Sequence, residues 1–293
     1  MRMRRSLASL CLFSSLVTAP IAHAQDAPAA HAQEAAKPQT QENSITVTGQ
    51  AQKPIKRAQR YIRQVLDTSD GQLARFIEPV CPLVIGLPAR FKTSIEDRVR
   101  LVAGAASVRL GKDKCQPNVM IVFADNADTL IQTMRKQRNA AFTNLDDGAL
   151  RDAFQSGPIH AWRLVAIRDE VGNYSTGNDD PDYPPVMEGD TQAVTINAVV
   201  VMDRKVALGK SVRQLGDYVV MRALVGAKPP AKGSIASASI LSLFDPNVAP
   251  PPTEISDMDI GLLAGLYKLK NPFEEGSDQA WRISKGMVPG KQH

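Results

Sequence analysis

Acidic side chains are the only plentiful groups that could do chemistry in this 293-residue chain. Four of them lie in the C-terminal third, at Asp217, Glu254, Asp257 and Asp259. Two carboxylates held about 5–10 Å apart can perform acid–base catalysis on a glycosidic bond. Asp257 and Asp259, however, stand two residues apart at an expected helix start, where carboxylates cap the helix and interact favourably with its dipole. We therefore expect capping there, and hydrolysis remains an alternative.

Histidine is too scarce for most zinc and nucleophile chemistry. Of the four histidines in the chain, only His160 lies inside the expected globular part, so neither a HExxH helix nor a three-histidine zinc site can form there. A Ser-His-Asp triad would need His160 as its general base, and no GxSxG turn exists to expose a serine. We expect a hydrogen-bonded strand histidine instead. The sequence therefore assigns no catalytic residue, no metal ligand and no cofactor.

Two further patterns are incomplete versions of known binding loops. Gly209-Lys210-Ser211 resembles the end of a phosphate-binding loop, but Arg204 stands where that motif needs a glycine. Ser211 is therefore expected to be a helix cap. The run at 178–182 offers oxygen ligands for calcium but lacks the glycine and the distal glutamate of an EF-hand loop. A solvated acidic loop is favoured there, with calcium binding as the alternative.

The start of the chain reads as an export signal. Three arginines precede a mostly apolar stretch at 7–22, and Ala22-His23-Ala24 is a small-x-small cleavage site. This pattern predicts a signal peptide at 1–24, cleaved after Ala24, and a periplasmic or secreted protein. Cleavage takes the formal charge from +5 to about +2, which argues against a nucleic-acid partner. No later apolar run reaches the roughly 20 residues needed to cross a bilayer.

Two cysteines remain after the leader, which contains Cys11, is removed. In an oxidising compartment, Cys81 and Cys115 most simply form one disulfide. A metal or redox pair is the alternative, but no histidine or third cysteine lies near them and their spacing is not CxxC. We therefore expect a disulfide between Cys81 and Cys115.

The rest of the chain divides into a tether and one domain. Residues 25–52, rich in Ala, Gln and Pro, cannot bury a core and read as a flexible tether. Residues 53–288 show no second break and form one globular domain, followed by a tail at 289–293. Hydrophobic periodicity predicts helices at 54–66, 93–110, 126–138, 145–154, 212–226 and 258–269, and strands at 72–76, 119–123, 159–168 and 193–202. This alternation predicts an α/β or α+β domain with helices packed on a mixed sheet.

Thr93 and Glu96 are expected to form a capping box, and Asp125 or Asn126, and Ser256, are expected to cap their helices. The continuous apolar run at 119–123 is typical of a strand covered on both faces.

The helix expected at 54–66 is basic and amphipathic. Its apolar residues recur at helical spacing, and its lysines and arginines at 53–63 lie on the other side. Such a helix can rest on anionic lipid. More often its apolar stripe packs on its own domain, and that packing is the favoured reading.

Two resemblances emerge from these motifs. The segment at 75–82, Arg-Phe-Ile-Glu-Pro-Val-Cys-Pro, together with Cys115-Gln116-Pro117-Asn118, is similar to an uncharacterised family of exported alphaproteobacterial, sphingomonad-type proteins; it implies no activity. The C-terminal third resembles, more distantly, an exported zincin-like domain of unknown function. The matching parts are the strand at 198–202, the helix at 215–226, the segment at 239–244, and the helix start at 256–259 with Leu266-Tyr267.

The zinc ligands of that domain are missing here. Aligning the helix ends places Asp217 and Met221 where two zinc histidines would stand, and Tyr218 where the catalytic glutamate would stand. The resemblance therefore implies a protease-like scaffold without its metal, because a lone aspartate cannot hold zinc. A binding groove is then expected between the helix at 215–225 and the strand at 193–202. Its candidate polar and core residues are Arg213, Gln214, Asp217, Tyr218 and Met221.

The leading interpretation is an exported, non-catalytic, metal-free zincin-like domain that binds an envelope protein, peptide or glycan. One alternative is a metal-independent hydrolase of envelope polymers that uses Asp and Glu. Another is a structural protein at a membrane surface, held by the basic helix at 53–63. The sequence leaves the partner and the oligomeric state open.

Overall fold

The computed structural model describes residues 53–68, 71–175, 191–231 and 233–288. The predicted leader, the tether, the acidic run at 178–182 and the tail at 289–293 lie outside these residues and stay predictions. Within the described part, no helix is both long and apolar enough to span a bilayer.

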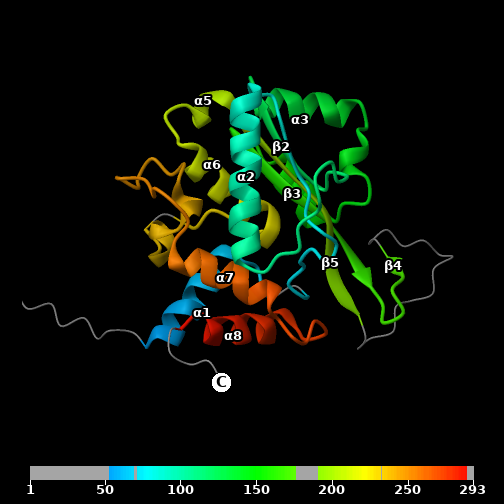
Figure 1. The fold of residues 1–293 in the computed structure, drawn as a ribbon, viewed down its shortest axis with the longest axis vertical. Helices are drawn as coiled ribbons and strands as arrows, with labels where there is room; N and C mark the ends of the chain where they lie inside the picture. The colour runs from blue at the N-terminus through cyan, green and yellow to red at the C-terminus, as the bar shows by residue number, and fades with distance from the viewer. Residues whose placement is uncertain (1–52, 69–70, 176–190, 232, 289–293) are drawn as a thin grey trace, which may run out of the picture. The chain divides into compact units, whose positions relative to one another are not determined.

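A five-stranded mixed sheet forms the centre of the domain, with strand order β1-β2-β5-β3-β4 (Figure 1). The strands are β1 (Pro82–Ile85), β2 (Val119–Ala124), β3 (Ile159–Arg168), β4 (Tyr174–Ser175) and β5 (Gln192–Asp203). β1, β2 and β5 run parallel, whereas β3 is antiparallel to β5 and β4 is antiparallel to β3. The predicted single domain with helices on a mixed sheet is therefore confirmed, in its α/β form.

Helices cover both faces of this sheet (Figure 1). The larger core packs α1 (Pro54–Val65), α2 (Ala89–Ala105), α6 (Val212–Val220), α7 (Asp257–Tyr267) and α8 (Gly276–Gly286) against one face. The smaller core packs α3 (Ala127–Lys136) and α4 (Asp147–Phe154) against the other. A short α5 (Arg204–Ala207) follows β5, and a π-helical segment, η2 (Met221–Val225), continues α6.

The burial of the strands follows their place in the sheet. β5 lies between β2 and β3 and is buried almost throughout, from Ala193 to Met202. β2 buries Val119, Ile121 and Phe123 completely, but Met120 on its other face is 37% exposed. The expectation that β2 is covered on both faces is therefore wrong at its start, because α3 packs only beyond that point.

The sequence misplaced two features near β1. The predicted Thr93–Glu96 capping box is wrong, because α2 already begins at Ala89, directly after Pro88. Pro88 is the N-cap of α2, with a ψ of 147°, and the Glu96 carboxylate instead accepts a hydrogen bond from the Val84 amide at 2.7 Å. The strand expected at 72–76 is reduced to one parallel bridge between Arg75 and Val194.

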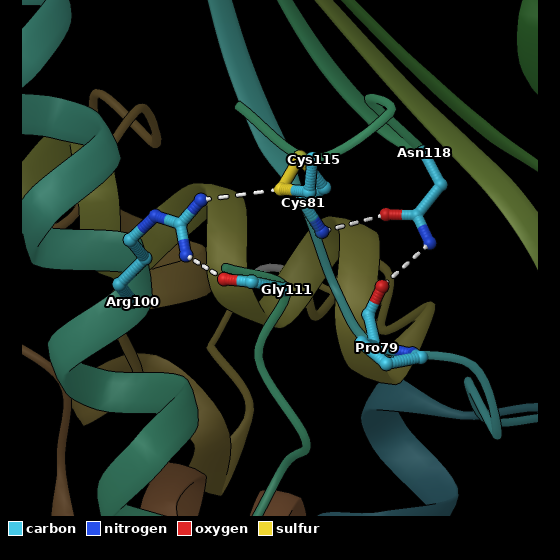
Figure 2. The surroundings of a disulfide bond; sticks show 6 residues. All are labelled: Pro79, Cys81, Arg100, Gly111, Cys115 and Asn118. Carbon is cyan, nitrogen blue, oxygen red and sulfur yellow. Dashed lines mark hydrogen bonds between the residues drawn. A yellow bond between two sulfur atoms is a disulfide. The ribbon is translucent and has the colours of Figure 1, made fainter. Parts of the chain in front are cut away.

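The expected disulfide is present and joins the start of β1 to the loop before β2 (Figure 2). Arg100 of α2 donates one hydrogen bond to the Gly111 carbonyl at 2.8 Å and a longer one to the Cys115 sulfur at 3.5 Å. Asn118 accepts from the Cys81 amide at 2.8 Å and donates to the Pro79 carbonyl at 3.1 Å. A side chain at Gly111 would place its Cβ 2.7 Å from the Cys115 sulfur, so glycine is required there.

This disulfide should contribute measurably to stability. The two cysteines are 34 positions apart, and closing a loop of that length stabilises a fold by roughly 3–4 kcal/mol in the chain-entropy view. Urea unfolding of the purified, oxidised protein should therefore show a loss of stability of about that size on reduction. The Cys81→Ser/Cys115→Ser double variant should not respond to reductant. Two reactive thiols in the unfolded, non-reduced protein would refute the bond.

Candidate functional site

The predicted groove helix begins as expected but turns most of its candidates inward. Ser211 caps α6 through a capping box with Gln214, which confirms its role as a cap. Gln214 also donates to the Pro252 carbonyl at 2.7 Å. Arg213 pairs on the surface with Glu254 at 2.9 Å. Arg213 and Gln214 therefore hold the loop before α7 against α6. Neither residue lines the two cavities described below.

Asp217 is a buried structural anion and not a groove residue. Its carboxylate is fully buried and accepts two hydrogen bonds from Arg98 of α2, at 2.6 and 2.9 Å. It also accepts one from the Ile255 amide at 2.8 Å. The hydrogen bond that Arg98 donates to Asp217 raises the pKa of Arg98. A Cβ at Gly216 would lie 2.7 Å from the Arg98 side chain, so this glycine lets α2 approach α6.

Met221 and Tyr218 are also buried, but Tyr218 reaches a cavity. Met221 is fully inaccessible within the larger core, so its assignment to a groove was wrong. Tyr218 packs edge-on against Phe244, with ring centres 4.9 Å apart, and both rings line a cavity. Burial raises the pKa of the Tyr218 hydroxyl, so this group stays a hydrogen-bond donor at neutral pH. The cavity that Tyr218 lines lies beside the start of β3, and the groove expected between α6 and β5 stays a prediction.

Two adjacent cavities lie between β3, α4 and η2, and we call them the paired cavities. The first, of about 270 Å³, is lined by the middle of β3, the start of α4 and the end of η2. The second, of about 530 Å³, is lined by the start of β3 together with Tyr218, Leu241 and Phe244. Asp152, Arg222 and Lys228 line both. The two spaces therefore meet at these three charged residues.

Arg222 keeps one donor without an acceptor at the paired cavities, although its guanidinium carbon also lies 6.0 Å from the centre of the Tyr218 ring. Its Nε atom is buried and has no hydrogen-bond partner. Among the described residues, no carboxylate oxygen lies within 4.0 Å of its guanidinium. A buried donor without an acceptor is costly, so this wall favours a ligand that brings an acceptor.

Arg163 forms a second cationic wall, in the first cavity. Its guanidinium donates to the Ala74 carbonyl at 2.9 Å and to the Thr195 hydroxyl at 3.3 Å. In the described chain it too has no carboxylate within ion-pair distance. Burial lowers the pKa of Arg163, because its charge is poorly solvated. Gly226, at a φ of 73°, leaves room for it, since a Cβ there would lie 2.2 Å from the guanidinium carbon.

The acidic residues of the paired cavities are occupied by other contacts. Asp152 pairs with Lys228 at 3.0 Å, and Asp146 caps α4 by accepting from the Ala149 amide at 2.7 Å. Asp67, which also lines the first cavity, has a partner of its own. Among the described residues, Arg163 and Arg222 therefore line the cavities without a carboxylate within ion-pair distance.

The other predicted candidates lie elsewhere. His160 is buried in β3, and its Nδ1 lies 2.9 Å from the Ala153 carbonyl, so Nδ1 carries the proton and the hydrogen-bonded strand histidine is confirmed. Asp259 is fully buried and completes the capping box of α7 with Ser256, as expected. Neither of these residues, nor Glu254 or Asp257, lines the paired cavities.

Sequence reasoning missed the two arginines that define this site. Arg163 interrupts an apolar strand, and Gly226 follows a helix without any polar neighbour in sequence; together these were the available signals. In the part of the chain that the structure describes, no group of three or more His, Cys, Asp or Glu side chains gathers to hold a metal. Comparisons with protein-family models, curated proteins and solved structures give no match.

Removing the Asp217 carboxylate should destabilise the fold strongly. Asp217→Ala leaves the Arg98 guanidinium and the Ile255 amide without their acceptor, and breaking a buried ion pair costs about 3–5 kcal/mol. Arg98 keeps 17% exposure, so we expect the lower end of that range in urea unfolding. Arg213→Ala, which breaks an exposed pair, should cost under about 1 kcal/mol. Equally small losses in both variants would show that Asp217 is not structural.

Proposed function

We propose that the protein is an exported, non-catalytic binding domain that holds its ligand, an envelope protein, peptide or glycan, at the paired cavities. The observation that carries the proposal is the unpartnered buried Nε of Arg222, which both cavities share. Binding sites typically combine an apolar wall with a few convergent polar groups. Tyr218, Leu241 and Phe244 supply such a wall, and Arg222 and Arg163 supply the polar groups.

Export is supported by the disulfide as well as by the leader sequence. A structural disulfide persists in oxidising compartments and is rare in the cytosol. The Cys81–Cys115 bond therefore agrees with a periplasmic or secreted protein.

We also propose that the C-terminal part is a zincin-like arrangement that has replaced its metal centre by an ion pair. Its support is the element order, in which β5 leads to α6, then to the segment at 240–242, then to α7. At the position aligned with a zinc ligand, Asp217 meets Arg98. The guanidinium neutralises the buried carboxylate, so no metal is needed to hold these elements together.

The two other functions stay predictions. For a carboxylate hydrolase, the four described aspartates that line the paired cavities already have contacts with other residues: Asp67, Asp146, Asp152 and Asp245. For membrane attachment, the apolar residues of α1 pack into its own domain, as favoured from the sequence. Its basic side chains are exposed, and no feature of the described residues identifies a lipid as their partner.

The role of Arg222 can be tested by capture from envelope extracts. The immobilised domain should retain one or a few components, and Arg222→Gln should bind them roughly ten- to a hundred-fold more weakly, because a hydrogen bond to a charged group contributes about 1.5–3 kcal/mol. Arg213→Gln on α6 lies outside the paired cavities and is the matched control. Unchanged thermal unfolding would establish that Arg222→Gln is folded. Retention that is equal in all three proteins would move the site elsewhere.

A further inference from the structure

The paired cavities follow an open strand edge. On the side away from β5, β4 pairs only with Ile167 and Arg168 of β3. Among the described residues, the stretch of β3 from Ile159 to Ala166 therefore has no strand partner on that side. Unpaired strand edges present main-chain donors and acceptors that another chain can use.

The register identifies which groups of β3 are available. The Asp203 amide donates to the Pro158 carbonyl, so Pro158 and every second residue after it bond to β5. The intervening residues direct their N–H and C=O groups away from β5. On β5 the alternation agrees, because the Ala198 amide, opposite Arg163, bonds toward β2 at the Asn118 carbonyl.

These outward-facing residues line the paired cavities, together with Pro158 and Trp162. Ile159 lines the second cavity, and Ala161, Arg163 and Val165 line the first. Ile159 and Ala161 belong with the same core as Tyr218 and Leu241, so their side chains point to the η2 side of the sheet. A strand laid along this edge would therefore have alternate side chains facing Arg163, Arg222 and the apolar wall of the second cavity.

We propose that the open edge of β3 binds an extended acidic peptide as an added strand. Main-chain hydrogen bonds to Ile159, Ala161 and Arg163 would supply affinity, as in other cases of strand addition. An Asp or Glu side chain would bind Arg222 and Arg163, and an apolar side chain two or four residues away would enter the second cavity. This inference rests on the proposed function and names its ligand class.

Charge complementarity favours an acidic peptide over a neutral or basic one. Arg222 and Arg163 have no carboxylate partner in the described part of the chain, and guanidinium groups bind carboxylates with two parallel hydrogen bonds. The Lys228–Asp152 pair lies where the two cavities meet. Lys228 is 55% exposed, so this ion pair is weak enough to open as a peptide passes.

The test uses an array of synthetic octapeptides and the folded mature protein. Each peptide carries one Asp or Glu, with Leu, Phe or Tyr two or four residues away, and binding is measured by fluorescence anisotropy. We expect a subset to bind, Lys in place of the acid to weaken binding at least tenfold, and Arg222→Gln to remove that preference while Arg213→Gln keeps it. N-methylation of one alternate set of peptide amides should abolish binding, and methylation of the other set should not.

The outcomes separate this inference from the proposed function. If Arg222→Gln loses a captured envelope component but no acidic octapeptide binds, the proposed function stands and the peptide inference is wrong. The inference is equally overturned if a uronic-acid oligosaccharide binds in place of the peptides. The inference also fails if both sets of N-methylated peptides bind as well as the parent peptide, because binding would then not depend on main-chain hydrogen bonds.

Discussion

The fold depends on two buried carboxylates that hold the segment between η2 and α7 in place. Asp259, fully buried, accepts hydrogen bonds from Tyr61 of α1, from Ser239 at 2.5 Å and from the Ile240 amide at 3.0 Å. Asp217 accepts hydrogen bonds from Arg98 of α2 and from the Ile255 amide. A buried carboxylate is tolerated only when its oxygens accept hydrogen bonds. These contacts therefore hold the segment that carries Leu241 and Phe244, which line the second cavity.

The buried carboxylates of this molecule have hydrogen-bond partners within the fold, whereas an arginine of the candidate site has a donor without an acceptor. The carboxylates that looked most useful in the sequence, Asp217 and Asp259, have all their partners within the fold. The sequence patterns assigned no role to Arg163 or Arg222, yet the buried Nε atom of Arg222 has no partner and both arginines line open space. Gln64, His160 and Arg168 also carry a buried side-chain atom without a hydrogen-bond partner, but none of them lines the paired cavities. A buried polar group without a partner calls for an explanation, and at Arg222 the adjacent open space gives one.

What could be predicted from the sequence depended on the range of the interactions. Strand β3 and the caps at Asn126, Ser211 and Ser256 were predicted because their patterns are local, and the disulfide because only two cysteines were available. Glu96 failed as a cap because its partner, Val84, belongs to a neighbouring strand. The paired cavities could not be predicted, since they depend on the register of β3 and on contacts between residues as distant as Asp152 and Lys228.

The irregular end of α6 ties the site to the core. A π-helical turn contains one residue more than an α-helical turn, which rotates the side chains that follow by about 100° relative to a regular helix. In η2 this rotation lies between Met221, fully buried, and Gly226, whose left-handed conformation ends the helix. Tyr267 holds the turn by donating to the Leu224 carbonyl at 3.1 Å, and its burial raises its pKa to about 12, so it remains a donor at neutral pH. Arg222 lies within this segment and lines both cavities, and the Arg163 guanidinium lies against Gly226 at its end, so the same segment contacts or contains both cations.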